Sequence, residues 1–268
     1  VGSEMCIRDR LYSLNTMFSD ANSINKGNNN LHNLALAYTS QKGISAGVEY
    51  MNYTDAGTQD MEILNDGSFQ QTFSYWRKQS IDKARAYFDM SHTLKNNWIL
   101  NYGANYNYVS NYNEQENTDI QNGGENDYAK ASEVNEHTAI AYIGFQKSFF
   151  NGKLSFNASL SGELYKINDY KKNALLPNAE ITFVPSNKHI FQLSYNTLRT
   201  YPTYWQRQDF TSYSDEYTVY MGNPLLKPAR TSNINLTYVL KSKYIFQASY
   251  YRVNDFFIEQ SYQMPDEL

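Results

Sequence analysis

Apolar and polar side chains alternate along much of this chain. The clearest run covers residues 98–108, where Trp98, Leu100 and Tyr102 begin an apolar series, while Asn and Gly fill the alternate positions from residue 101 to 107. Side chains of a β-strand point to its two faces in turn. Such a run therefore predicts a strand with one apolar face and one polar face.

Eleven segments have this pattern or a weaker form of it, and together they predict an all-β, antiparallel fold. Short polar connections join neighbouring runs as hairpins, as residues 241–243 do for the last two. The expected strands are residues 11–19, 31–41, 44–54, 69–94, 98–108, 136–149, 154–167, 176–184, 190–198, 233–240 and 244–251.

The connections between the runs alternate in length. Short turns are expected at residues 42–43, 95–97, 150–153, 185–188 and 241–243, and longer loops at 20–30, 55–68, 113–131 and 199–227, with 168–173 as a shorter exception. Successive connections of an up-and-down sheet lie at opposite ends. Outer-membrane barrels have short periplasmic turns and long extracellular loops, and the alternation favours that architecture.

Alternation alone is also compatible with a soluble β-sandwich, whose apolar faces pack against each other. Three features favour a membrane. Tyr or Trp residues lie near the ends of the apolar faces, several runs exceed the ~9–11 residues that a tilted strand needs to cross a bilayer, and the opposite faces are rich in Asn, Ser, Gln and Glu. A soluble extracellular β-sheet binding module remains the alternative. The net charge of −4 gives no basic surface for nucleic acid.

The stretch that begins at Gly222 carries a family resemblance. Gly222-Asn223-Pro224, followed by Leu225, Leu226, Lys227 and Pro228 and then by the last hairpin, resembles the C-terminal barrel region of TonB-dependent outer-membrane receptors of the type common in Bacteroidota. Residues 176–179 and the pair Tyr201-Pro202 fit the same pattern, although the family often has Arg where this chain has Tyr201.

The resemblance implies a partial transmembrane barrel of about eleven strands, here an open curved sheet, in the bacterial outer membrane. It also implies outer-membrane lipid as a partner, and import of a nutrient with energy from TonB. TonB would act through a plug domain, which we expect to lie outside this chain. A passive porin or a structural barrel is the alternative from another functional class.

Residues 201–220 are the candidate ligand-contacting segment, because aromatic and charged side chains are interleaved there. The candidate contacts are Tyr201, Tyr204, Trp205, Arg207, Tyr213 and Tyr217. The alternative interpretation is that these aromatic side chains pack the segment onto the rim of the barrel. Gly222, Asn223, Pro224 and Pro228 are expected to form the turn that leads back into the membrane.

The remaining expectations concern the chain ends and catalysis. Residues 1–9 resemble a translated sequencing adaptor, so we expect residues 1–10 to form no fold and residues 11–268 to form one partial barrel domain. The four His residues do not have the spacing of metal ligands, and the sequence offers no Ser/His/Asp set. We therefore expect no enzymatic activity, no cofactor and no metal site.

Overall fold

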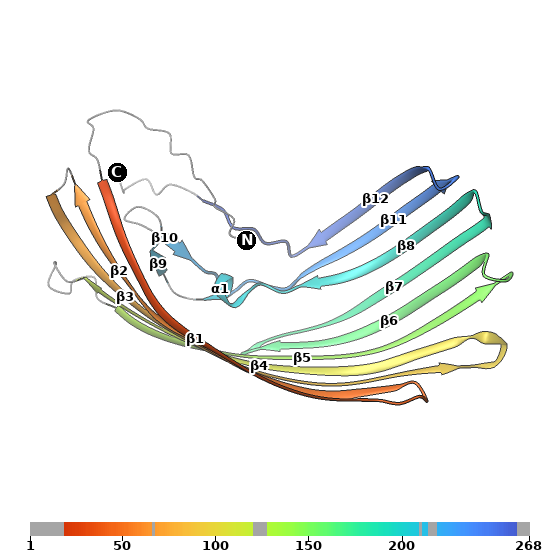
Figure 1. The fold of residues 1–268 in the computed structure, drawn as a ribbon, viewed down its shortest axis with the longest axis horizontal. Helices are drawn as coiled ribbons and strands as arrows, with labels where there is room; N and C mark the ends of the chain where they lie inside the picture. Colours follow the sequence, from red (N-terminus) through yellow and green to blue (C-terminus); the bar gives the residue numbers. More distant parts are fainter. Residues whose placement is uncertain (1–18, 66–67, 120–127, 209–210, 214–218, 262–268) are drawn as a thin grey trace.

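A computed structural model describes residues 19–65, 68–119, 128–208, 211–213 and 219–261 of the 268-residue chain. Ten strands form one antiparallel sheet in the order β1-β2-β3-β4-β5-β6-β7-β8-β11-β12, which curves like a gutter (Figure 1). The strands are β1 Ser19–Thr39, β2 Ile44–Asn65, β3 Ser68–Thr93, β4 Ile99–Asp119, β5 Tyr128–Phe149, β6 Leu154–Ile167, β7 Tyr170–Ser186, β8 His189–Thr200, β11 Ala229–Leu240 and β12 Tyr244–Asn254.

Three shorter elements and one single turn complete the described structure. The α-helix α1 covers Tyr204–Arg207, and β9 (Thr211–Tyr213) pairs with β10 (Val219–Met221) in a separate two-stranded sheet. A 3₁₀ turn covers Lys95–Asn97. No helix within the described residues is long and apolar enough to span a membrane.

The open, curved antiparallel sheet predicted from alternation is confirmed. Each of the ten expected strands after residue 19 corresponds to one strand of the large sheet. The first expected strand, residues 11–19, lies outside the described residues apart from Ser19, which begins β1. The sheet is open because β1 and β12 each pair on one side only.

The short turns gather at one end of the sheet, as the alternating connection lengths predict (Figure 1). Three of them contain two consecutive non-glycine residues with φ between 52° and 59°. Two residues with positive φ at a hairpin tip are the mark of a type I′ turn, whose twist matches that of the flanking strands. The three residue pairs are Asn96 and Asn97, Phe150 and Asn151, and Lys241 and Ser242.

Three of the four expected long loops are wrong, because most of their residues are strand. Residues 20–30 belong to β1, which pairs with β2 without interruption from Thr39↔Ser45 to Ser19↔Asn65. Residues 55–65 belong to β2, residues 113–119 belong to β4, which ends at Asp119, and residues 128–131 belong to β5, which begins at Tyr128. The exception at 168–173 is shorter still, since β7 begins at Tyr170 and leaves a two-residue turn.

The two faces of the sheet differ in polarity. Residues paired across antiparallel strands share a face, so the register traces each row of side chains over the sheet. One outward row consists of Leu36, Val48, Ala86, Tyr106, Ala139 and Leu164. Buried residues of β4–β6, such as Asn111, Thr138 and Glu163, all lie on the opposite face.

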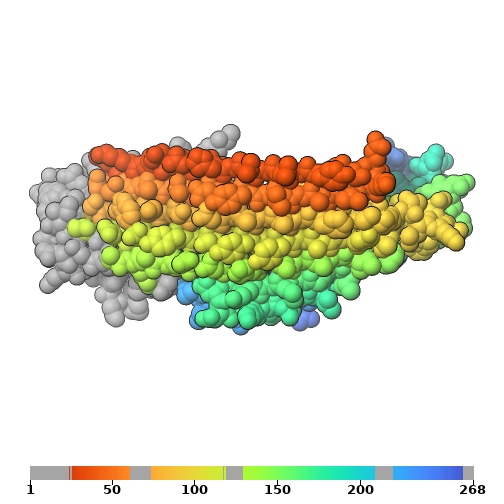
Figure 2. Space-filling view, turned by 90° about the horizontal axis from the view of Figure 1, so that it is seen from below, coloured from red at the N-terminus to blue at the C-terminus, as the bar shows by residue number. Residues whose placement is uncertain are grey.

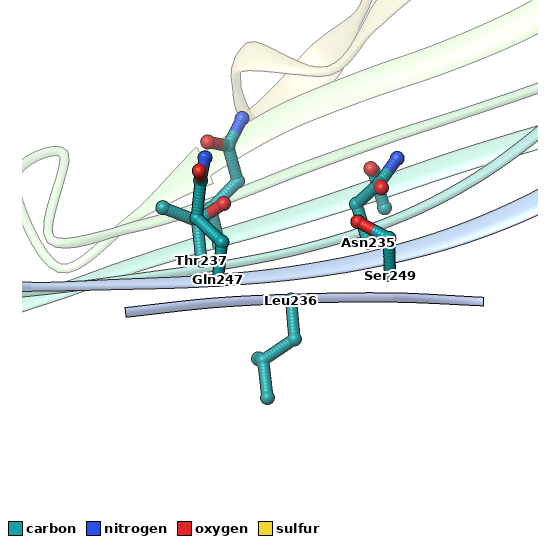
Figure 3. A pocket seen from close by; sticks show the side chains of 7 residues that line it. Asn235, Leu236, Thr237, Gln247 and Ser249 are labelled. Carbon is teal, nitrogen blue, oxygen red and sulfur yellow. The ribbon is translucent and has the colours of Figure 1, made fainter. Parts of the chain in front are cut away.

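The apolar face is the convex one, which Figure 2 shows as a continuous surface of neighbouring strands. In Figure 3, Leu236 points away from Asn235 and Thr237, which lie on the side toward which the sheet curves. No second sheet covers the convex face within the described residues, and Leu34 and Leu36 on it are each 72% exposed. A water-soluble sandwich would bury such side chains, so this surface is built to face lipid.

The outward face changes from apolar to polar between two adjacent rows on β1–β5. The last largely apolar row consists of Leu34, Tyr50, Ala84, Tyr108 and His137, and the next row consists of His32, Asn52, Asp82, Ser110 and Asn135. Tyr50 Oη donates to Asp82 Oδ1 (2.6 Å) and Tyr108 Oη to Asn135 Oδ1 (2.9 Å) across this step. Tyr residues with apolar rings and polar ends are typical of the membrane–water interface.

A second aromatic belt lies near the end of the sheet that carries the short turns. Phe183, Phe191, Tyr238 and Phe246 stack in series across β7, β8, β11 and β12, with centroid distances between 4.5 and 6.3 Å. The two aromatic levels bracket the apolar band, as girdles do in outer-membrane barrels. The strand segments beyond the upper level, including Ser19–His32 of β1, therefore project out of the membrane on the side opposite the short turns.

Candidate functional site

The connection between β8 and β11 folds back onto the concave side of the sheet (Figure 1). We call its described residues, 201–208, 211–213 and 219–228, the inner segment. It contains α1, β9 and β10. The helix begins with a capping box, in which Thr203 Oγ1 accepts from Gln206 N (3.2 Å) and Gln206 Oε1 accepts from Thr203 N (3.0 Å). These reciprocal bonds satisfy two backbone donors and fix the start of the helix.

A buried ion pair holds the start of the inner segment to the sheet. Arg199 Nη1, at the end of β8, lies 2.8 Å from Glu163 Oε1 on β6, and their side chains are only 3% and 1% exposed. Tyr201 Oη donates to the other carboxylate oxygen, Glu163 Oε2, at 2.6 Å. Burial, followed by this hydrogen bond, raises the pKa of Tyr201 far above its ordinary value. Its phenol is therefore a neutral donor at any physiological pH.

A second chain of hydrogen bonds holds α1. Arg207 Nη1 donates to Tyr165 Oη (2.8 Å), and Tyr165 Oη donates to Glu136 Oε2 on β5 (3.2 Å). Burial raises the pKa of Tyr204, and the nearby Glu136 carboxylate raises it further. We call Glu136, Glu163, Tyr165, Arg199, Tyr201 and Arg207 the anchoring cluster. It links three strands of the sheet to the inner segment.

Arg199 reaches β6 because β8 separates from β7 near its end. The pairing of β7 with β8 stops at Ala179↔Tyr195. Beyond that point, Thr197 N donates to Asn178 Oδ1 (2.9 Å) and Thr197 Oγ1 donates to the Pro177 carbonyl oxygen (2.6 Å). Side-chain hydrogen bonds thus replace the backbone pairing between β7 and β8. Two residues further on, Arg199 reaches Glu163 on β6.

The predicted turn residues close the inner segment against α1. A Cβ atom on Gly222 would collide with the backbone of Gln208 and Trp205, so only glycine permits this close approach. Asn223 N donates to the Gln206 carbonyl oxygen (2.7 Å), and Asn223 Oδ1 accepts from Leu225 N (2.9 Å). Pro224 follows in the turn and is exposed, whereas Pro228 is fully buried just before β11.

The structure gathers four of the six candidate ligand-contacting residues around α1. Tyr201 and Arg207 bond to the sheet, Tyr204 is half-buried, and Trp205 is 48% exposed. Tyr213 belongs to β9, and its side chain lies outside the described residues, as does the whole of Tyr217. Two of the candidates therefore serve as structural anchors, and Trp205 has the surface that a ligand could reach. Ligand contact itself stays a prediction.

Sequence reasoning missed the partners of these residues on the sheet. Glu163 was assigned only to the polar face of its strand, and Glu136, Tyr165 and Arg199 were not singled out. Glu163 and Arg199 lie two strands apart in the sheet, and Arg199 lies beyond the last β7–β8 pair, so the pattern along either strand does not reveal their contact. The one available signal was Glu163 itself, flanked by Gly162 and Leu164, as the only acidic residue of the run from residue 154 to 167.

One depression on the concave face, away from the anchoring cluster, is lined by neutral hydrogen-bonding groups. This shallow depression of about 230 Å³ lies on β8, β11 and β12 (Figure 3). Its polar lining residues are Gln192, Ser194, Asn235, Thr237, Gln247 and Ser249. The described part of the chain contains no group of three or more His, Cys, Asp or Glu side chains that could hold a metal ion. This wall can therefore bind water and uncharged polar solutes.

Solved structures with the same architecture come from outer-membrane import systems. The RagAB peptide transporter shares the fold with a TM-score of 0.58 and 10% identity, over 86% of this chain and 30% of that chain. BauA, the ferric preacinetobactin receptor from Acinetobacter baumannii, matches with a TM-score of 0.52 and 12% identity, over 85% of this chain and 37% of that chain. The chain thus spans about a third of the length of these proteins, and at such identities the likeness concerns the fold.

A family model gives the assignment. The model of the outer membrane protein beta-barrel family matches residues 38–267, which is most of the chain. No curated protein matches the chain in sequence. The match and the fold confirm the expected outer-membrane barrel, its place in the bacterial outer membrane and the resemblance to barrels of TonB-dependent receptors. This chain belongs to the outer membrane protein beta-barrel family.

Proposed function

We propose that this chain forms part of the barrel of an outer-membrane importer that takes up a nutrient with energy supplied through TonB. The observation that carries the proposal is the inner segment, fixed on the concave face by the anchoring cluster. An unobstructed pore has no use for a folded segment held inside it by a buried ion pair. A ligand-gated importer needs such a segment, because its lumen must present binding groups and stay closed to other solutes.

The exposed side chains of the inner segment support a role in ligand contact. Trp205 is 48% exposed, and Tyr220 and Met221 are 37% and 68% exposed. The two structures with the same fold are named for a peptide and for a ferric siderophore. We propose that the ligand of this protein is likewise a solute larger than those that diffuse through porins, with its class open between these two.

Uptake by intact cells tests the proposal. A strain without the gene should fail to grow when the ligand is the only source of the nutrient, and the full-length gene should restore growth. Defined peptides and ferric siderophores are the probes, each supplied as the single source of nitrogen or of iron. Restored growth should disappear when TonB is also deleted. Growth that persists without TonB would instead identify a passive porin.

A variant of the inner segment separates ligand contact from barrel assembly. Trp205→Ala should raise the KM of uptake while leaving the amount of folded barrel unchanged, because the Trp205 side chain bonds to no strand within the described residues. Trp76→Ala is the matched control, since Trp76 lies on the outward face of the projecting part of β3. Equal effects of the two substitutions on KM would remove Trp205 from the ligand site.

A further inference from the structure

The short turns gathered at one end of the sheet all carry lysine, and none of them carries an acidic residue. They join β1 to β2, β3 to β4, β5 to β6, β7 to β8 and β11 to β12. No Asp or Glu lies within four residues along the chain of any of these lysines, and without them the net charge would be −10 rather than −4. We call the six side chains the basic rim: Lys42, Lys95, Lys153, Lys188, Lys241 and Lys243.

The charge of the basic rim is not neutralised within the described part of the chain. All six lysines are exposed, and none of them forms an ion pair with another described residue. By contrast, Arg77, Arg85 and Lys172 each have a carboxylate oxygen at 3.3–3.8 Å. The basic rim therefore presents its positive charge to whatever lies beyond this end of the barrel.

The charges of the basic rim are spread along an arc. Successive turns lie two strands apart in the sheet, which is roughly 10 Å at the usual spacing of strands. Five turns thus cover an arc of roughly 40 Å. A single small anion can contact only one or two of these lysines, whereas an extended polymer with repeated acidic groups can contact most of them.

The tips of the turns extend past the lipid headgroups. Lys241 follows three residues after Tyr238 of the second aromatic belt. At ~3.3 Å per residue and a tilt of about 45°, this places its backbone roughly 7 Å beyond the belt. The headgroup layer is only about 5–8 Å thick on each side of a bilayer, and the long lysine side chain carries its ammonium group further out. The charged groups are thus in reach of partners in the water beyond the membrane.

We propose that the basic rim binds peptidoglycan, the cell-wall polymer of the periplasm, through the free carboxylates of its peptides. Short turns form the periplasmic end of outer-membrane barrels, so the basic rim faces that compartment. Exposed ion pairs are weak one at a time, but several made to one polymer reinforce one another. This contact depends on the orientation of the barrel and is independent of the ligand that the barrel imports.

Sedimentation with purified peptidoglycan sacculi measures the contact, with the full-length protein in a neutral detergent. The quadruple variant Lys42→Gln/Lys95→Gln/Lys188→Gln/Lys241→Gln should bind sacculi roughly tenfold more weakly, about what four exposed ion pairs contribute together. The matched control is Lys26→Gln/Lys78→Gln/Lys166→Gln/Lys171→Gln, which removes four exposed lysines nearer the opposite end of the sheet. It should bind as the unaltered protein does, and equal binding by the two variants would overturn the proposal.

Three further probes identify the anion. Sacculi whose carboxylates have been converted to neutral amides should not bind, and high salt should release unmodified sacculi. An anionic phospholipid added to the micelles should not compete. Binding of amidated sacculi, or displacement of sacculi by the phospholipid, would overturn the proposal. Binding of polyglutamate without binding of sacculi would also overturn it, since the basic rim would then fit an acidic protein.

A charge-conserving variant excludes a folding defect. Arginine at positions 42, 95, 188 and 241 should bind sacculi as lysine does, because the contact needs positive charge at these positions and no particular donor geometry. Heat-modifiable gel migration should be the same for the glutamine, arginine and control variants. Loss of sacculus binding by the arginine variant, with its migration unchanged, would contradict an electrostatic contact.

Discussion

Glu163 is 1% exposed as a side chain whereas Leu34 is 72% exposed, which reverses the usual preferences of these residue types. The reversal follows from two solvents on the two faces of one sheet. Lipid stabilises exposed Leu34, and on the concave side the charge of Glu163 is compensated by Arg199 and Tyr201. The effect of a substitution should therefore depend on which face of the sheet the residue occupies and on its height relative to the membrane.

Loss of the buried carboxylate should release the inner segment. Glu163→Ala leaves Arg199 buried without a counter-charge and Tyr201 without an acceptor, a change that costs about 3–5 kcal/mol in comparable buried pairs. Urea unfolding of the full-length protein in lipid vesicles, followed by the fluorescence of Trp205 with all other Trp residues replaced by Phe, should show the segment detaching at lower urea. The matched control is Glu49→Ala, which breaks a pair with Arg85 that is 39% exposed on both sides. It should cost less than about 1 kcal/mol. Equal shifts for both variants would contradict the anchoring role.

Two strand glycines should differ sharply in their tolerance of a methyl group. On the concave face, a Cβ on Gly103 would lie 2.5 Å from the Phe88 carbonyl oxygen and 2.8 Å from the Tyr142 ring, which donates its hydroxyl to Asp89. On the convex face, a Cβ on Gly162 would meet nothing closer than 4.0 Å.

Gly103→Ala should therefore lower stability by about 1–3 kcal/mol through overpacking, and Gly162→Ala should leave it unchanged or raise it slightly. Heat-modifiable gel migration in increasing urea measures both variants. A Gly103→Ala protein as stable as the original would show that the Phe88 backbone and the Tyr142 ring both move aside at no cost.

At the residue scale, the sequence predicted which face a side chain occupies but not which partner it meets. Leu236 and Asn235 lie on the faces expected from alternation. The contact of Arg199 with Glu163 depends on where β8 separates from β7, and that point is set by Thr197 and Asn178. A side chain that bonds to backbone leaves no periodic signal, so such contacts need the three-dimensional structure.

At the element scale, strand length was the main error. Within the membrane, lipid requires one apolar face, so alternation marks the strands clearly. Above the membrane, both faces of β1 and β2 are in water, and Asn28–Asn30 or Thr58–Asp60 look like loop. Backbone pairing continues there regardless, because the ladder needs only N–H and C=O groups.

The assignment of the two faces of β11 to lipid and to water can be tested by substitution. Leu236→Arg should strongly reduce folded barrel in the outer membrane, since an arginine on the lipid face near the bilayer midplane costs ~2–4 kcal/mol. Asn235→Arg should be mild, because the concave face keeps the charge in water. Cysteine at each position, probed with a bilayer-restricted quencher, decides the assignment. Quenching at residue 235, or at neither residue, would show that the faces are assigned wrongly.

The two ends of the strands should differ in access from outside the cell. Asp169 and Ser242 are both exposed and lie in short turns at opposite ends of the sheet. In the full-length protein, Asp169→Cys should react with a membrane-impermeant thiol reagent on intact cells, and Ser242→Cys should react only after the outer membrane is permeabilised. Protein without an introduced Cys gives the background. The reverse pattern would invert the orientation in the membrane.

At the scale of the whole molecule, the described sheet has two free edges, β1 and β12. Each edge carries unpaired backbone groups, and lipid offers them no hydrogen-bonding partner. Residues 19–261 expressed alone should therefore aggregate rather than insert. Size-exclusion chromatography in detergent, with protease digestion, checks this. A monomeric, protease-resistant product would mean that the two edges find partners within the fragment.

The projecting parts of β1–β5 also set how far the protein stands above the cell surface. Residues 19–32 of β1 pair continuously with residues 52–65 of β2 beyond the upper aromatic level. At ~3.3 Å per residue and a tilt of about 45°, these paired strands rise roughly 30 Å above the lipid. That height is comparable to the thickness of the membrane core itself. A molecule that approaches from outside the cell therefore meets this stiff wall of paired strands before it meets any headgroup, and antibodies or phages would meet it first as well.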